Sequence, residues 1–201
     1  MSNGNFNCPF CREPPPEDYE EFDKRMMKRI KANDPAALRE MGRMRYHKGD
    51  WDTAVAYWTK AAELGDAPSH YSLGGMYWKG EGVAKDEEKG VYHYEKAAIA
   101  GHPWARNMLG CIEGKHENYE RSVKHFIIAA NLGSEESMKA LWTYYSVGCN
   151  TKEDLEATLR THKAALDEMK SAQRDAADSL FKGLLNGQHL SLNVNWGSYH
   201  L

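Results

Sequence analysis

The chain has 201 residues, of which 41% are hydrophobic and 27% charged, with a net charge of −3 at pH 7. This is enough chain for a globular protein with a proper core, and the negative charge argues against nucleic-acid binding by bulk electrostatics. No apolar run is long enough to cross a membrane, no secretory leader opens the chain, and four cysteines do not suggest a disulfide framework. We therefore expect an intracellular protein, with the cytoplasm favoured over the nucleus.

Residues 1–16 are predicted to form an extended tail with a cysteine pair, Cys8 and Cys11. A C-x-x-C pair supplies two ligands, whereas a structural zinc site needs four. A redox site resembling that of glutaredoxin would need a helix directly after the pair to lower the thiol pKa. Three consecutive prolines, 14–16, exclude that helix and leave a zinc half-site or two free thiols.

The stretch C-P-x-C-R-x-P, residues 8–14, resembles the last ligand pair of a RING-type zinc finger, the module with which many ubiquitin ligases recruit their E2 enzymes. In that family the last pair shares its zinc with an earlier Cys/His pair, and none of the first seven residues is Cys or His. The resemblance implies a C-terminal RING remnant, and a tail with free thiols stays open. We expect no cofactor, and zinc only if the missing ligands come from elsewhere.

Residues 17–33 place Tyr19, Phe22, Met26 and Ile30 at helical spacing. Such an apolar stripe predicts a lead-in helix packed on the first repeat unit.

Three internal repeats come next, predicted as units 34–65, 66–101 and 102–133. Each ends in an aromatic residue, a pair of alanines and a glycine, as in WTKAAELG, YEKAAIAG and FIIAANLG, whose glycines are 36 and 32 residues apart. Periods near 34 are typical of helix–turn–helix arrays. The shared aromatic position, Trp58, Tyr94 and Phe126, is predicted to be core.

Residues 134–170 are predicted as a degenerate fourth unit, in which 152–169 form a more polar capping helix. The repeat array therefore covers residues 34–170. Residues 171–183 are predicted as one more short helix within a C-terminal segment, 171–201, that ends in a loosely attached tail.

The pattern LG-x-x-Y-x-x-G-x-G-V-x-x-D at 73–86, followed by KAA at 96–98, resembles a Sel-one-like repeat (SLR), a relative of the tetratricopeptide repeat. The resemblance implies an all-α, right-handed α-α solenoid that binds proteins through an extended concave face. No P-loop, nucleophile elbow or other catalytic motif is present. We expect a monomeric, non-enzymatic scaffold for a protein or peptide partner; the alternative is the substrate-recognition part of a RING-type E3 ubiquitin ligase with a truncated finger.

In the related tetratricopeptide arrays, the first helix of each unit lines the groove. Stepping by four along those helices gives the predicted partner-binding residues Arg39, Arg43, His47, Tyr71, Lys79, Asn107, Lys115 and Lys139, with Gly75, Cys111 and Thr143 on the same faces and Trp78 added beside Lys79. The set has five fixed positive charges and no acidic residue. It predicts an acidic, extended peptide anchored at Tyr71 or Trp78, although merely solvated charges would give the same pattern.

The remaining metal-ligand residue types are scattered. Cys111 and Cys149 lie near helix glycines and are predicted to be buried or half-buried packing residues. His93 and His125 occupy equivalent repeat positions beside core aromatics, which favours a structural role over metal binding.

Overall fold

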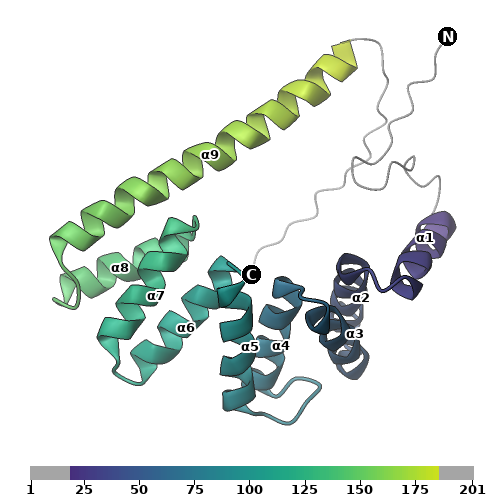
Figure 1. The fold of residues 1–201 in the computed structure, drawn as a ribbon, viewed down its shortest axis with the longest axis horizontal. Coiled ribbons are helices and arrows are strands. Elements are labelled where there is room, and N and C mark those ends of the chain that lie inside the picture. Colours follow the sequence, from purple (N-terminus) through teal and green to yellow (C-terminus); the bar gives the residue numbers. More distant parts are fainter. Residues whose placement is uncertain (1–18, 186–201) are drawn as a thin grey trace. The chain divides into compact units, whose positions relative to one another are not determined.

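A computed structural model describes the backbone of residues 19–185 and the side chains of Glu21 and residues 23–168. Within that part of the chain the regular structure is helical, without a strand (Figure 1). The helices are α1 (Tyr19–Lys31), α2 (Pro35–His47), α3 (Trp51–Glu63), α4 (Ala67–Lys79), α5 (Glu87–Ile99), α6 (Pro103–Lys115), α7 (Tyr119–Asn131), α8 (Glu135–Ser146) and α9 (Lys152–Leu185).

The helices α2–α7 form three pairs, and each helix also packs against the next one along the chain. All six have 13 residues. The loop between α4 and α5 spans 80–86, seven residues, whereas the corresponding loops 48–50 and 116–118 have three. That difference of four accounts for the periods of 36 and 32, and the predicted all-α repeat solenoid is confirmed.

Local sequence fixes where the helices begin and end. The Asp34 carboxylate accepts hydrogen bonds from the backbone N–H groups of Ala36 and Ala37, and Asp66 caps α4 in the same way through Ser69. Gly65 and Gly101 follow the second helices with φ of 87° and 83°, a region that glycine enters without strain. The same capping devices recur because the chain makes the same turn in each unit.

A glycine on the first helix of each pair faces an aromatic ring on the second. A Cβ atom added to Gly42 would lie 2.6 Å from the ring of Trp58; at Gly74 and Gly110 it would lie 2.7 Å from the rings of Tyr94 and Phe126. These distances are shorter than van der Waals contact, so the rings occupy the space that a Cβ would need. The close helix approach within each pair therefore depends on glycine at these positions.

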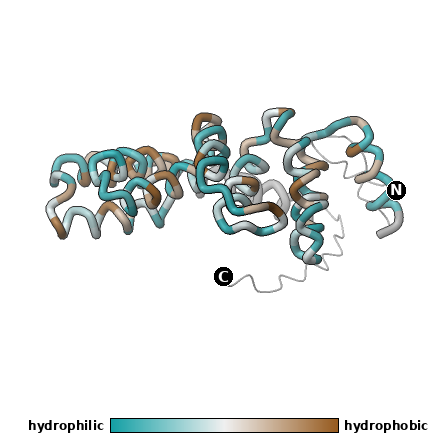
Figure 2. Tube along the Cα trace, turned by 90° about the horizontal axis from the view of Figure 1, so that it is seen from below, coloured by the Kyte–Doolittle hydropathy of each residue, from teal (hydrophilic) through white to brown (hydrophobic). Residues whose placement is uncertain are grey.

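The core is continuous from unit to unit. Leu73 and Met76 of α4 are buried against Ala54, Trp58 and Ala62 of α3, and further clusters join α5 to α6 and α7 to α8. Hydrophobic positions accordingly alternate with hydrophilic ones along the helices (Figure 2). Each unit buries its apolar face against its neighbours, as expected of a solenoid.

The fourth unit lacks the glycine–aromatic contact. By the 32-residue period, Trp142 stands where Gly110 stands in α6, and Thr158 stands where Phe126 stands in α7. Trp142 is 51% exposed, and Leu155 of α9 is buried with Met138 and Leu141 of α8. The helix α9 also contacts α7, where His162 Nδ1 lies 2.8 Å from the Ala130 carbonyl oxygen.

The helix α9 runs without a break from Lys152 to Leu185, so the prediction of two separate helices, 152–169 and 171–183, is wrong. Residues 170–182 contain neither proline nor glycine and are rich in alanine, so nothing in them ends a helix. The described helices up to Leu166 belong to one compact unit. The half-site Cys8 and Cys11 and the tail from residue 186 onward lie outside the described residues.

Two smaller predictions have mixed outcomes. Met26 and Ile30 of α1 are buried against α2, which confirms the stripe of the lead-in helix for these two positions. Cys149 is half-buried, but Cys111 is exposed, because its neighbours Gly110 and Ile112 take the buried positions of α6. None of the helices described between residues 19 and 185 combines the length and apolar character of a membrane span.

The adjacent glycines of α4 provide a matched test of the close contact. We expect Gly74→Ala to lower the free energy of unfolding by about 1–3 kcal/mol, because the new methyl group overlaps the Tyr94 ring. Gly75→Ala should be neutral or stabilising by up to about 1 kcal/mol, because its Cβ would lie 3.7 Å from the Tyr94 hydroxyl and alanine favours helix. Urea unfolding measures both; equal effects would contradict the account.

Candidate partner-binding groove

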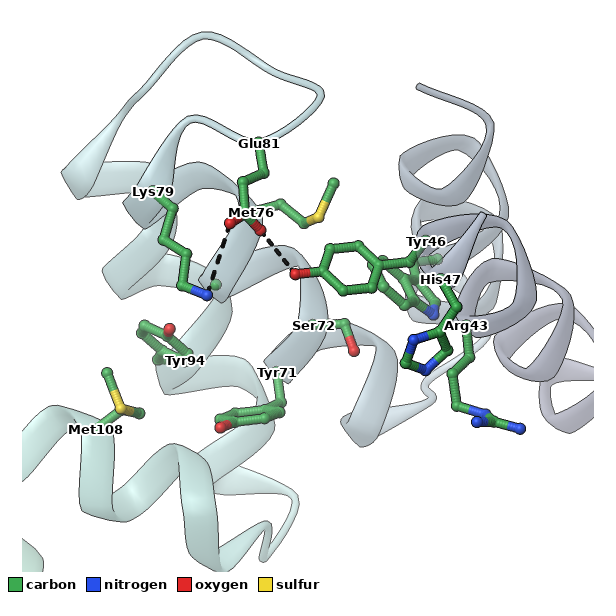
Figure 3. A pocket seen from close by; sticks show the side chains of 12 residues that line it. Arg43, Tyr46, His47, Tyr71, Ser72, Met76, Lys79, Glu81, Tyr94 and Met108 are labelled. Carbon is green, nitrogen blue, oxygen red and sulfur yellow. Dashed lines mark hydrogen bonds and ion pairs between the residues drawn. The ribbon is translucent and has the colours of Figure 1, made fainter. Parts of the chain in front are cut away.

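A groove of about 370 Å³ lies mainly over the first helices α2, α4 and α6 (Figure 3). Its remaining lining comes from α3, α5 and the long loop after α4. The lining residues are Arg43, Tyr46, His47, Trp58, Tyr71, Ser72, Gly75, Met76, Lys79, Glu81, Tyr94 and Met108.

The floor of the groove is apolar and aromatic. Trp58, Met76 and Tyr94 are buried, and Tyr71 and Met108 are half-buried beside them. Trp58 and Tyr94 are the rings that pack on the glycines of α2 and α4, so the helix contact also positions the floor. A flat surface of rings held by the core is suited to an apolar side chain from a partner.

The two tyrosines add unused hydrogen-bonding groups. Tyr71 stacks on His102, with ring centroids 4.8 Å apart, and contacts Tyr94 at 5.8 Å. Burial raises the pKa of both phenols, with Tyr71 adding to the effect on Tyr94, so both stay protonated at neutral pH. Neither hydroxyl bonds to another described residue, which leaves both able to donate to a bound segment.

Charged side chains form the rim. Glu81 accepts a hydrogen bond of 2.9 Å from the Tyr46 hydroxyl and lies 3.7 Å from Lys79 Nζ. Burial, and then Glu81, raise the pKa of Tyr46. On the other side, Arg43 pairs with Glu40 at 3.0 Å beside the exposed His47. The rim presents mostly donors, with Glu81 as the acidic residue of the lining.

The structure brings together part of the predicted binding set. Arg43, His47, Tyr71 and Lys79, with Gly75, line one groove. The others lie elsewhere. Arg39 pairs with Asp66, Asn107 donates a 2.7 Å hydrogen bond to Ser137, Lys115 lies over the Trp78 ring 5.5 Å from its centroid, and Lys139 is exposed on α8.

The predicted surface, with five cations and no acidic residue, is less positive in the structure than the spacing predicts. Three of its five cations, Arg39, Arg43 and Lys79, have carboxylate partners, and Glu81 itself lines the groove. Glu40 lies on α2 itself, whereas Asp66 caps α4 and Glu81 lies in the loop after α4, so a four-residue step along one helix leaves out all three. Among the lining residues Arg43 and Lys79 are therefore opposed by Glu81, and Glu40 beside the groove pairs with Arg43.

Sequence reasoning missed Tyr46, Met76, Glu81 and Met108 as lining residues and assigned Trp58 and Tyr94 to the core alone. For Trp58 and Tyr94 the assignment to the core is correct but incomplete, because they also form the floor. Of the missed residues, only Glu81 could have been found from the sequence, because the long loop GEGVAKD, residues 80–86, brings it to the end of α4.

The described side chains contain no group of three or more His, Cys, Asp or Glu residues that could hold a metal ion. His93 and His125 lie in helix interfaces rather than in such a group, and burial lowers the pKa of both.

The three complete helix pairs match a known kind of repeat. The profile of the Sel1 repeat matches residues 35–66, 67–102 and 105–134. The chain contains three Sel1 repeats. The matched segments correspond to the three helix pairs that carry the glycine–aromatic contact, and the fourth unit, where Trp142 and Thr158 replace it, lies beyond them.

Solved structures agree with this assignment. A Sel1 repeat protein from Oxalobacter formigenes superposes with a TM-score of 0.61 at 26% identity, over 75% of this chain and 65% of that one. A protective antigen of uropathogenic Escherichia coli strains, described as displaying an SLR fold, gives 0.59 at 28% identity, over 70% of this chain and 32% of its own. The present chain therefore spans less than two thirds of the length of either protein. None of the curated proteins matches it.

A histidine pair lies next to the groove, between α4 and α5 of the second Sel1 repeat. The Nδ1 atoms of His70 and His93 are 3.0 Å apart, and Tyr77 stacks on His93 with centroids 5.5 Å apart. Burial, and then His70, lower the pKa of His93 to about 4; burial and Lys96 lower that of His70, against the opposing effect of Asp66. Both rings are therefore neutral in the folded chain at pH 7.

This pair predicts a loss of stability on acidification. Below pH 6.5 the unfolded chain binds protons that folded His93 binds only near pH 4, so the free energy of unfolding should fall from pH 6.5 to 5. We expect His93→Phe to flatten this slope and His116→Gln, at an exposed position outside the pair, to keep it. Thermal melts across that pH range measure both; an unchanged slope in His93→Phe would contradict the prediction.

Proposed function

We propose that this chain is a non-catalytic scaffold that holds an extended segment of a partner protein in the α2–α4–α6 groove. Sel1 repeat proteins generally act as protein-interaction scaffolds, which supports the general part of the proposal. The specific part of the proposal concerns which surface binds the partner and which residue types of the partner it prefers.

The observation that carries the proposal is the pairing of an aromatic floor with unused donors. An apolar side chain of the partner would cover Tyr71, Tyr94 and Met108, where burial of aromatic surface contributes most of the affinity. The two tyrosine hydroxyls, and Arg43 and Lys79 at the rim, would then meet acceptors, namely carboxylates or backbone carbonyls.

Charge refines the choice of ligand. Arg43 and Lys79 together outweigh Glu81, so an acidic residue flanking the apolar one is favoured over a basic residue. Because Lys79 is held by Glu81, removing that carboxylate should strengthen binding of an acidic segment. A preference for carboxylates that increases in Glu81→Gln would distinguish this groove from a non-specific apolar surface.

We would select peptides from a random library on the intact chain and measure their affinities by fluorescence anisotropy. We expect enrichment of an apolar residue beside Asp or Glu. Tyr71→Ala and the double reversal Arg43→Glu/Lys79→Glu should each weaken binding at least about tenfold, which corresponds to ~1.4 kcal/mol. Raising the salt concentration should weaken binding of the wild-type chain.

The matched control is Lys60→Glu/Lys163→Glu, which makes the same charge change at exposed positions outside the groove. It should bind the selected peptides like the wild type. Peptides bound equally well by the groove reversal and by this control, at low and high salt, would contradict the proposed function.

A further inference from the structure

A second groove follows the outer face of α5. It consists of two adjoining hollows of about 350 Å³ each, both lined by Val91 and Glu95. Trp78, Tyr92 and His116, with Glu87 and Glu88, complete the first hollow. The second contains the apolar residues Ile99, Leu109 and Ile112, and is bordered by Glu113, Arg121, Arg106 and His125. We call the two hollows together the α5 groove.

The first hollow is acidic. Three carboxylates, from Glu87, Glu88 and Glu95, line it, and neither lysine nor arginine is among its lining residues. Glu87 pairs with Lys85 at 2.8 Å, outside the lining. Glu88 and Glu95 form no ion pair with any described side chain, and both are exposed to solvent.

The aromatic rings of the same hollow already hold cations of the chain itself. Lys115 Nζ lies 5.5 Å from the centroid of Trp78, and Lys96 Nζ lies 5.4 Å from that of Tyr92. Tyr92 is 52% exposed, so much of its ring remains accessible. An ammonium or guanidinium group from outside would share the exposed Tyr92 ring with Lys96 and would meet the unpaired carboxylates of Glu88 and Glu95.

The repeats provide an internal control for what packing alone requires. Of the four residues that give the α5 groove its character, only Trp78 has an equivalent of the same kind in another unit, the aromatic Tyr46. Tyr46 and Gly114 stand at the position of Trp78, Ala56 and Lys124 at that of Tyr92, Thr59 and Ile127 at that of Glu95, and Glu63 and Asn131 at that of Ile99. The fold is therefore built in the first and third units without this combination.

Among these four residues, Ile99 differs most clearly from its equivalents in the other units. Its side chain is 78% exposed, the highest value among the exposed large hydrophobic residues of the described chain, while both repeat equivalents are polar. An exposed isoleucine at the end of a hollow lined by Leu109 and Ile112 extends its apolar surface outward.

We propose that the α5 groove binds a basic segment of a partner protein. A lysine or arginine of that segment enters the Trp78–Tyr92 hollow, and an apolar residue further along covers Ile99. The cation is assigned to the first hollow because Glu88 and Glu95 there form no ion pair with a described side chain, whereas Glu113 at the second hollow already pairs with Arg121 at 2.8 Å. Its preference is opposite to that of the α2–α4–α6 groove, so a Sel1 array of this size could hold two different partners.

The test uses isotope-labelled full-length chain and a defined probe, the acetylated and amidated peptide Gly-Lys-Leu-Gly-Lys-Leu-Gly. We expect the probe to shift the indole N–H signal of Trp78 and the amide signals of α5 in NMR titrations. The same peptide with glutamate in place of lysine should leave these signals unchanged.

Variants then separate charge, aromatic and apolar contributions. Glu88→Gln/Glu95→Gln should raise the dissociation constant of the basic peptide at least about tenfold, while Glu63→Gln/Glu136→Gln, at exposed positions outside both grooves, should leave it unchanged. Tyr92→Ala and Ile99→Ser should each weaken binding, and because both side chains are exposed the fold should persist. Shifts that map away from the residues lining the α5 groove, or equal affinities of the two glutamine double variants, would overturn the proposal.

Discussion

The close contact between a glycine on the first helix and an aromatic ring on the second determines the rest of this structure. In each complete Sel1 pair the ring fills the volume of the missing Cβ, with Gly42 on Trp58 as the first instance. The contact sets the helix spacing within a unit and so the surface on which the next unit packs. In the fourth unit Trp142 and Thr158 replace this contact, and Trp142 is 51% exposed.

The same rings connect fold to function. Trp58 and Tyr94 pack against Gly42 and Gly74 on one side and form the floor of the α2–α4–α6 groove on the other. A partner that covers them meets side chains already fixed by the core, which lowers the conformational entropy lost on binding. The α5 groove, in contrast, uses residues that the helix contact does not require, so its sequence is free to specify a different ligand.

The repeat pattern predicts much of the fold because each unit repeats one set of local rules. Caps such as Asp34, closing glycines such as Gly65 and the shared aromatic position specify where helices begin, end and meet. The candidate groove was less accessible to sequence reasoning. Its acidic residue, Glu81, comes from a loop, and Trp78, which lies beside Lys79 in sequence, lines a different surface. Which side chains share a groove depends on how units stack, and one helical period does not contain that information.

A double-mutant cycle on Gly110 and Phe126 tests the central contact most directly. With Phe126 present, Gly110→Ala should lower the free energy of unfolding by about 1–3 kcal/mol, because the new Cβ would lie 2.7 Å from the ring. In the Phe126→Leu background the same substitution should cost almost nothing, or stabilise the helix by up to about 1 kcal/mol. This account predicts strong coupling between the two sites; equal costs of Gly110→Ala in both backgrounds would contradict it.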